Sequence, residues 1–139
     1  MTKYKPIHKS RLIAFKEDRI LVLEKVGARK KYTLAGGVQK KGESDYKSLI
    51  RETSEEIGVT LKKKHLTYFI SIKNVTKDKK IVFKHYFITT KSIVNIEVLE
   101  PEKFKKALWM PWYQALEFLD KEDRSAVVLY CDQFRQEAN

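Results

Sequence analysis

The chain has 139 residues, of which 42% are hydrophobic and 34% are charged. This size and composition predict one compact domain over residues 1–139 and exclude a disordered chain. A formal net charge of +11 predicts anionic partners, whether free nucleotides or nucleic acid, and charge alone does not choose between them.

The sequence also bears on location. No apolar run is long enough to span a bilayer, and residues 1–10 lack the apolar core of a signal peptide. We therefore expect a cytoplasmic protein without a membrane partner.

The first elements predicted along the chain are strands. Residues 11–15 and 20–24 are apolar, β-prone runs separated by four charged residues, which predicts a hairpin, and another short strand is expected to end near Leu34. Ala35, Gly36 and Gly37 then predict a break in regular structure, because paired glycines permit unusual backbone angles. A ligand can approach the backbone closely at such a break.

A helix is predicted between Ser44, a good N-cap, and Gly58, which suits a left-handed C-terminal residue. At about 100° per residue, apolar and acidic side chains separate onto two neighbouring faces. The apolar face holds Tyr46, Leu49, Ile50, Thr53 and Ile57, and the acidic face holds Asp45, Glu52, Glu55 and Glu56. We expect the first face to pack and the second to bind.

Further elements are predicted downstream. Residues 66–75 and 80–89 form a hairpin, and residues 92–99 add a strand. Residues 108–119 hold a strand, a proline turn and a helix, and a last helix spans residues 122–136. Mixed strands with helices before and after the last strand fit an α/β fold. The specific expectation is a helix-sheet-helix sandwich with a mixed β-sheet.

The predicted helix lies inside a motif of fixed spacing. Its residues are Gly37, Glu43, Arg51, Glu52, Glu55, Glu56, Gly58 and Val59. This pattern resembles the Nudix box, the signature of hydrolases that split nucleoside diphosphates linked to a further group. Thr53 departs from the pattern, which prefers an aliphatic residue there, although a β-branched side chain of similar volume can pack.

The resemblance implies the Nudix fold and a metal-dependent pyrophosphohydrolase that attacks a phosphoanhydride and releases a monophosphate as one product. It also implies that Glu52, Glu55 and Glu56, with the Gly37 carbonyl, hold Mg²⁺ or Mn²⁺. Carboxylates crowded on one helical turn repel each other, and a divalent cation with oxygen ligands offsets that repulsion.

Arg51 is the expected orienting residue, since its guanidinium can fork onto Glu43 or onto Glu55 at i+4. Glu43 is interpreted as a structural partner of Arg51 or of loop amides. The general base stays open at this point: Glu52 or Glu55 in the helix, or Glu97, Glu100 or Glu102 from a later segment, are all candidates.

No substrate-binding residue is assigned from the sequence. The basic loops at residues 29–31 and 40–41 flank the motif and are the better candidates for extra phosphates. Aromatic residues in the strands, such as Tyr32 and Tyr86, are more often core than a base-stacking platform. The three histidines show no metal spacing and are interpreted as surface or packing residues.

The basic composition mildly favours a nucleoside triphosphate or a dinucleoside polyphosphate as substrate. Within the enzyme class, a hydrolase that removes oxidised nucleotides or trims RNA 5′ ends is an alternative. From other classes, the alternatives are a catalytically silent nucleotide-sensing module and an RNA-binding module on the same fold. Nucleic acid as a partner is possible but not favoured, and the oligomeric state is not predicted.

Overall fold

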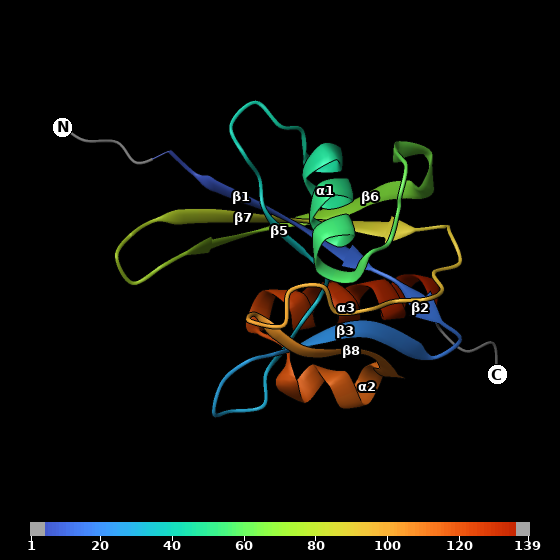
Figure 1. Cartoon of the computed structure of the whole chain (residues 1–139). Coiled ribbons are helices and arrows are strands. Elements are labelled where there is room, and N and C mark those ends of the chain that lie inside the picture. Colours follow the sequence, from blue (N-terminus) through green and yellow to red (C-terminus); the bar gives the residue numbers. More distant parts are fainter. Residues whose placement is uncertain (1–4, 136–139) are drawn as a thin grey trace.

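The computed structural model describes residues 5–135, which form two β-sheets with helices on both sides (Figure 1). The first sheet has the order β5-β1-β7-β6. Its strands are β5 (Gly36–Val38), β1 (Ile7–Ile13), β7 (Ile81–Thr89) and β6 (Leu66–Val75). The β1–β7 pair is parallel and the other pairs are antiparallel, so this sheet is mixed.

The second sheet is antiparallel and is built around β3 (Arg19–Lys25), which pairs with β2 (Phe15–Lys16), β4 (Tyr32–Thr33) and β8 (Phe104–Pro111). The hairpin predicted here is shorter than expected, because only β2 folds back onto β3. The chain changes sheets at Ala14, whose carbonyl accepts a 3.0 Å hydrogen bond from the Leu21 amide, and the residues before it pair with β5 and β7.

The helices are α1 (Asp45–Ile57), α2 (Trp112–Ala115) and α3 (Lys121–Phe134), with short 3-10 helices η1 (Lys63–His65) and η2 (Leu116–Phe118). Both predicted ends of α1 are confirmed. The Ser44 side chain accepts from the Lys47 amide at 3.2 Å, and Gly58 adopts φ +70°. No helix within residues 5–135 is long and apolar enough to cross a membrane.

The two remaining helices differ in detail from expectation. The helix after the proline turn is one turn of α2 followed by η2, because Leu119 leaves the helical region with an extended backbone. The last helix begins at Lys121 under an Asp120 N-cap, and its predicted end, Gln136, lies outside the described residues.

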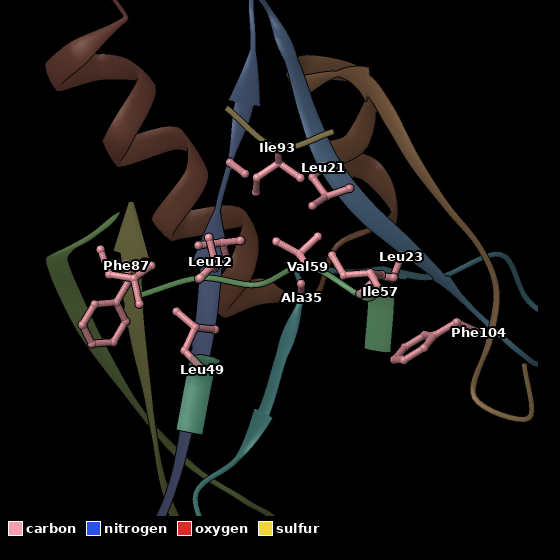
Figure 2. Packing of buried hydrophobic residues seen from close by; sticks show 13 residues of the cluster. Leu12, Leu21, Leu23, Ala35, Leu49, Ile57, Val59, Phe87, Ile93 and Phe104 are labelled. Carbon is pink, nitrogen blue, oxygen red and sulfur yellow. The ribbon is translucent and has the colours of Figure 1, made fainter. Parts of the chain in front are cut away.

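Two hydrophobic clusters separate the layers of the sandwich. On β1 and β3, alternate side chains face opposite sides: Leu12 and Leu21 join the cluster under α1, and Ile13 and Ile20 join the cluster against α3. Figure 2 shows Leu12, Leu49, Ile57 and other members of the first cluster meeting between α1 and the strands. This two-residue alternation buries both faces of the strands and confirms the α/β sandwich.

The predicted break at residues 35–37 is wrong, since Gly36 and Gly37 belong to β5 and pair with Arg11 and Ser10 of β1. The close approach expected there is real. A Cβ on Gly36 would lie 1.9 Å from the Ser10 carbonyl oxygen, and Gly36 has φ +138°. The glycine therefore allows a tight strand pair.

The strand predicted at residues 92–99 is also wrong. This segment is extended, but its amides bond to the end of α1: Glu97 donates to the Ile57 carbonyl at 3.2 Å and Leu99 to the Glu56 carbonyl at 2.9 Å. Ile93 anchors the segment in the core. These bonds satisfy carbonyls that the helix end leaves without partners, so no strand ladder forms.

Candidate active site

Arg51 is the centre of the acidic side of α1. Its Nε lies 2.7 Å from Glu43 Oε2, and its Nη1 lies 2.6 Å from Glu52 Oε1 and 2.9 Å from Glu55 Oε1. Its Nη2 also donates to the Val38 carbonyl at 3.1 Å. Both partners predicted for Arg51 are found, together with Glu52 and a β5 carbonyl. The guanidinium therefore fixes three carboxylates relative to the strand.

Glu43 acts as the expected structural partner of Arg51 and of a loop amide. Besides its bonds to Arg51, its Oε1 accepts from the Lys40 amide at 2.9 Å. The hydrogen bond from Arg51 holds the pKa of Glu43 at about 2, far below its ordinary value. Glu43 is thus ionised throughout the neutral range and closes the loop between β5 and α1.

Glu52 lies directly over Gly37. A Cβ added to Gly37 would meet Glu52 Oε2 at 2.1 Å. Any larger residue at position 37 therefore displaces this carboxylate. The helix side chain and the strand backbone are in contact at the point where the sequence motif begins.

Glu56 is buried, with 3% of its surface exposed, although the helical pattern had placed it on the acidic face that was expected to bind rather than to pack. Its Oε1 accepts from the Gly36 amide at 2.9 Å. Burial, followed by the charge of Glu52, raises the pKa of Glu56 to about 8. The sequence did not indicate this burial, because the carboxylate is turned onto the backbone of β5, a contact between residues 20 positions apart that has no local signal.

Thr53, the departure from the motif, fits the core. It is fully buried, and its Oγ1 donates to the Leu49 carbonyl at 2.9 Å, one turn earlier in the helix. The hydroxyl is thus satisfied without a partner outside α1.

Of the three later carboxylates considered as a base, Glu100 is the one that is turned toward the helix. Glu97 and Glu102 are exposed, whereas Glu100 is half-buried and its charge raises the pKa of Glu56. Its Oε1 is buried and has no hydrogen-bond partner in the described part of the chain. Glu100 therefore faces the same region as Glu52 and Glu56.

The carboxylates lie in one region of the described structure, but they do not point to a common point where a metal ion could bind. Within residues 5–135, no group of three or more His, Cys, Asp or Glu side chains converges as metal ligands do. Glu52 and Glu55 are turned onto Arg51, and Glu56 is turned onto the Gly36 amide. The donor set still suits a hard cation, since a buried carboxylate crowded by two others and an unpartnered carboxylate oxygen both gain from a nearby positive charge.

A pocket of about 400 Å³ is linked to this region through Arg11, whose charge acts on Glu56, and sequence reasoning missed most of the pocket wall. Arg11 of β1 and Lys84 of β7 line it, from strands far apart in the sequence. The predicted basic loop at residues 29–31 lines it too, whereas residues 40–41 line a different groove. Tyr32 forms part of the wall, and Tyr86 is buried in the core.

His8 and His85 pack against each other and against neighbouring side chains. His8 Nδ1 and His85 Nε2 are 2.8 Å apart, and His85 Nδ1 lies 2.5 Å from Ser71 Oγ. Phe83 stacks beside His8 with ring centroids 5.4 Å apart. The parallel β1–β7 register brings these residues onto the sheet face that α1 covers, so the packing interpretation holds.

Comparisons with known proteins agree with this geometry. The family model described as NUDIX domain matches residues 8–130. Among solved structures, the E. coli ORF135 protein superposes with a TM-score of 0.79 at 19% identity, covering 97% of this chain and 96% of that one. The MutT NUDIX hydrolase from Burkholderia pseudomallei superposes with a TM-score of 0.74 at 18% identity, covering 90% of this chain and 98% of that one.

An Ap4A hydrolase from C. elegans gives a TM-score of 0.71 at 18% identity, with 93% of this chain and 98% of that one covered. The comparison with curated protein sequences gave no significant match. The fold and the glutamate-rich helix are those of a Nudix-type hydrolase. The chain belongs to the Nudix hydrolase family, as its sequence motif indicated.

Proposed function

We propose that this protein is a divalent-metal-dependent pyrophosphohydrolase that cleaves a phosphoanhydride in a nucleoside diphosphate linked to another group. The observation that carries the proposal is the arrangement around Glu56: a buried carboxylate next to Gly36 and Gly37, with the charges of Glu52 and Glu100 acting on it. Such crowding is costly in a resting protein and useful at a cation site.

Glu52, Glu55 and Glu56, the Gly37 carbonyl and Glu100 are the residues that would hold Mg²⁺ or Mn²⁺. When bound, such a cation neutralises charge on the phosphate oxygens and activates water. Glu52 and Glu55 must turn from Arg51 to serve as ligands, and Arg51 keeps them within reach of that position. Arg51 is therefore a positioning residue.

The reaction forms a bond between a water oxygen and phosphorus and breaks the bond between that phosphorus and the bridging oxygen. The proton released by the water passes to a carboxylate, and the bridging oxygen leaves with a monophosphate or with the remaining nucleotide. Glu52, Glu55 and Glu100 are the candidates for the base, because each side chain is more exposed than that of Glu56.

Polyphosphate substrates are favoured over nucleotide sugars. One solved relative of the fold is named an Ap4A hydrolase, and the pocket beside the carboxylates is lined with cations. Both observations support a nucleoside triphosphate or a dinucleoside polyphosphate. They do not require nucleic acid.

The test is product release over a panel of nucleoside triphosphates, dinucleoside polyphosphates, nucleotide sugars and capped RNA, with Mg²⁺ or with chelator. We expect turnover of a polyphosphate class that chelator abolishes. Tight binding of any member without turnover of any would indicate a silent sensing module, and salt-sensitive RNA binding without turnover would indicate an RNA-binding protein.

The base is assigned by a second set of variants. Glu100→Gln is expected to lower kcat at least about tenfold, while the exposed matched changes Glu97→Gln and Glu102→Gln leave it near the wild-type value. Equal rates in all three variants would leave Glu52 and Glu55 of α1 as the candidates for the base.

A further inference from the structure

The pocket beside the acidic cluster is strongly cationic. It lies between β1 and β7 on one side and the segment joining β3 to β4 on the other, and residues 117–120 close its end. Seven cationic side chains line it, against two carboxylates, Glu117 and Asp120. Such a lining attracts an anion.

The second carboxylate does not neutralise the pocket, because it is already engaged. Asp120 Oδ2 lies 2.5 Å from Lys84 Nζ, and Asp120 Oδ1 accepts from the Asp123 amide at 2.8 Å. Lys84 is 5% exposed and also lies 3.6 Å from both Glu122 and Asp123. The charge of the buried Lys84 ammonium is thus offset by Asp120, Glu122 and Asp123. Of the carboxylates in the pocket wall, Glu117 alone is left to offset the other six cations.

Those cations lie near one another, and Glu117 is the one carboxylate of the pocket wall left to offset their charge. Burial, followed by the charges of Arg11 and Lys84, lowers the pKa of Lys9. Arg11 Nε is buried and donates no hydrogen bond to any residue between 5 and 135. An unpartnered buried donor in a field of like charge is destabilising unless a ligand accepts from it.

Arg11 also connects the pocket to the acidic cluster. It is the register partner of Gly36, whose amide bonds to Glu56, and its charge acts on Glu56. An anion held beside Arg11 is therefore within electrostatic reach of Glu56. A chain of phosphates can extend from one to the other.

The aromatic part of the wall favours an anion over a stacked base. Tyr32 and Phe118 meet edge to face with centroids 5.2 Å apart, and Lys30 Nζ lies 5.4 Å from the Phe118 centroid and 6.0 Å from that of Tyr32. The Lys30 ammonium thus lies over the faces of the Tyr32 and Phe118 rings, where a base would stack. A nucleobase would have to displace it.

We propose that this pocket is an anion subsite for phosphate groups beyond the linkage that is cleaved, and that it selects substrates with a triphosphate or longer chain over nucleotide sugars. Arg11 contacts the phosphate nearer the carboxylates, and Lys25, Lys30 and Lys31 contact the farther ones. The Lys25 amide donates to the Lys31 carbonyl at 2.8 Å, which holds both residues at the same rim. The role in selection rests on the proposed hydrolase function, whereas the anion binding does not.

The test is calorimetric titration of the full chain with inorganic tripolyphosphate in chelator and low salt. The pocket variant is Lys25→Gln with Lys30→Gln and Lys31→Gln, all exposed residues. The control removes equal charge outside the pocket, with Lys64→Gln, Lys73→Gln and Lys77→Gln, also exposed. We expect the pocket variant to raise Kd at least about tenfold and the control less than about threefold. Circular dichroism checks that both variants fold.

Each outcome decides the proposal. No binding to wild type, or equal weakening in both variants, overturns the subsite, the second by attributing affinity to the overall surface charge. Binding lost only in the pocket variant supports it. If tripolyphosphate binds through the pocket but Mg²⁺ gives no hydrolysis of any nucleotide, the subsite stands and the hydrolase proposal falls. Hydrolysis without such binding supports the hydrolase and overturns the subsite.

Discussion

At the scale of single residues, Arg51 shows how one side chain organises a site. Its guanidinium bonds to Glu43, Glu52 and Glu55 and to the Val38 carbonyl, with all three carboxylates within 2.9 Å. A planar fork is needed for this many directed contacts, and an ammonium cannot supply it. The contacts depend on geometry as well as charge.

Arg51→Lys therefore tests orientation separately from charge. We expect kcat to fall about tenfold to a hundredfold, with a smaller change in KM, because Glu52 and Glu55 lose their fixed positions. Steady-state kinetics measures the split. Arg124→Lys, an exposed residue on α3, is the matched control and should match wild type. Unchanged kcat in Arg51→Lys would show that Arg51 does not position Glu52 and Glu55 for the reaction.

Gly36 and Gly37 are adjacent, but an added side chain would meet different kinds of atoms at the two positions. A Cβ at Gly36 meets the Ser10 carbonyl at 1.9 Å, a backbone contact that cannot move, whereas at Gly37 it meets the tip of Glu52. We expect Gly36→Ala to lower the free energy of unfolding by about 3 kcal/mol or more. Gly37→Ala should cost about 1 kcal/mol or less and still lower kcat by over about tenfold, because Glu52 is displaced.

Urea unfolding and steady-state rates on both glycine variants check these values. Wild-type turnover in Gly37→Ala would show that Glu52 does not need its position over the strand. Wild-type stability in Gly36→Ala would show that the backbone contact with Ser10 is not as tight as the structure has it.

At the scale of elements, α1 was the best predicted part of the fold, because its signals are local. Ser44 and Gly58 mark its ends through their own side chain and backbone. The contacts of Arg51 with Glu43 and Glu55 follow from short sequence separations as well. The hairpin of β6 and β7 was predicted for the same reason and is confirmed.

Elements whose partners are distant were predicted less well. Residues 92–99 have the pattern of a strand, but their amides bond to the end of α1, and this choice is made by tertiary structure. The burial of Glu56 likewise involves a distant partner, the Gly36 amide of β5. Arg11 and Lys84 reach the pocket through the parallel pairing of β1 with β7, which no local pattern reveals.

The N-cap of α1 gives a prediction at this scale. Ser44→Ala removes the acceptor for the Lys47 amide and is expected to lower the free energy of unfolding by about 1 kcal/mol. Ser54→Ala, an exposed position within the same helix, should change it by about 0.5 kcal/mol or less. Urea unfolding of the two variants compares them. Equal stability would mean that the cap contributes nothing measurable.

At the scale of the whole molecule, the buried carboxyl of Glu56 links stability to pH. Its pKa is about 8 in the folded protein against 4.5 as the ordinary value. Between these values the folded state keeps a proton that the unfolded state has released. The free energy of unfolding contributed by Glu56 is therefore complete below pH 4.5 and is lost as pH rises toward 8.

In chelator, wild type should lose stability relative to Glu56→Gln by on the order of 4 kcal/mol over this window, because glutamine does not titrate. Unfolding in urea at several pH values gives the two curves. Parallel curves would show that the pKa of Glu56 is not raised in the folded protein. Other titrating groups cancel in the comparison, since both proteins contain them.

The α/β sandwich and the family were both predicted from the sequence, because the motif spans the helix and its flanking loop. A single domain over residues 1–139 and a cytoplasmic location stay predictions. The basic composition only mildly favoured a polyphosphate substrate. The pocket proposed to select it is formed by four separate segments, so no local pattern indicates that pocket.

Metal-dependent hydrolysis driven by the carboxylates of α1 has one decisive test. It is the initial rate of product release with Mg²⁺ for wild type, Glu52→Gln and Glu56→Gln, with exposed Glu97→Gln as the control. We predict losses of about a hundredfold or more in the first two variants, about twofold or less in the control, and no turnover in chelator. Near wild-type turnover in Glu56→Gln, or turnover that survives chelator, would contradict the proposed hydrolase.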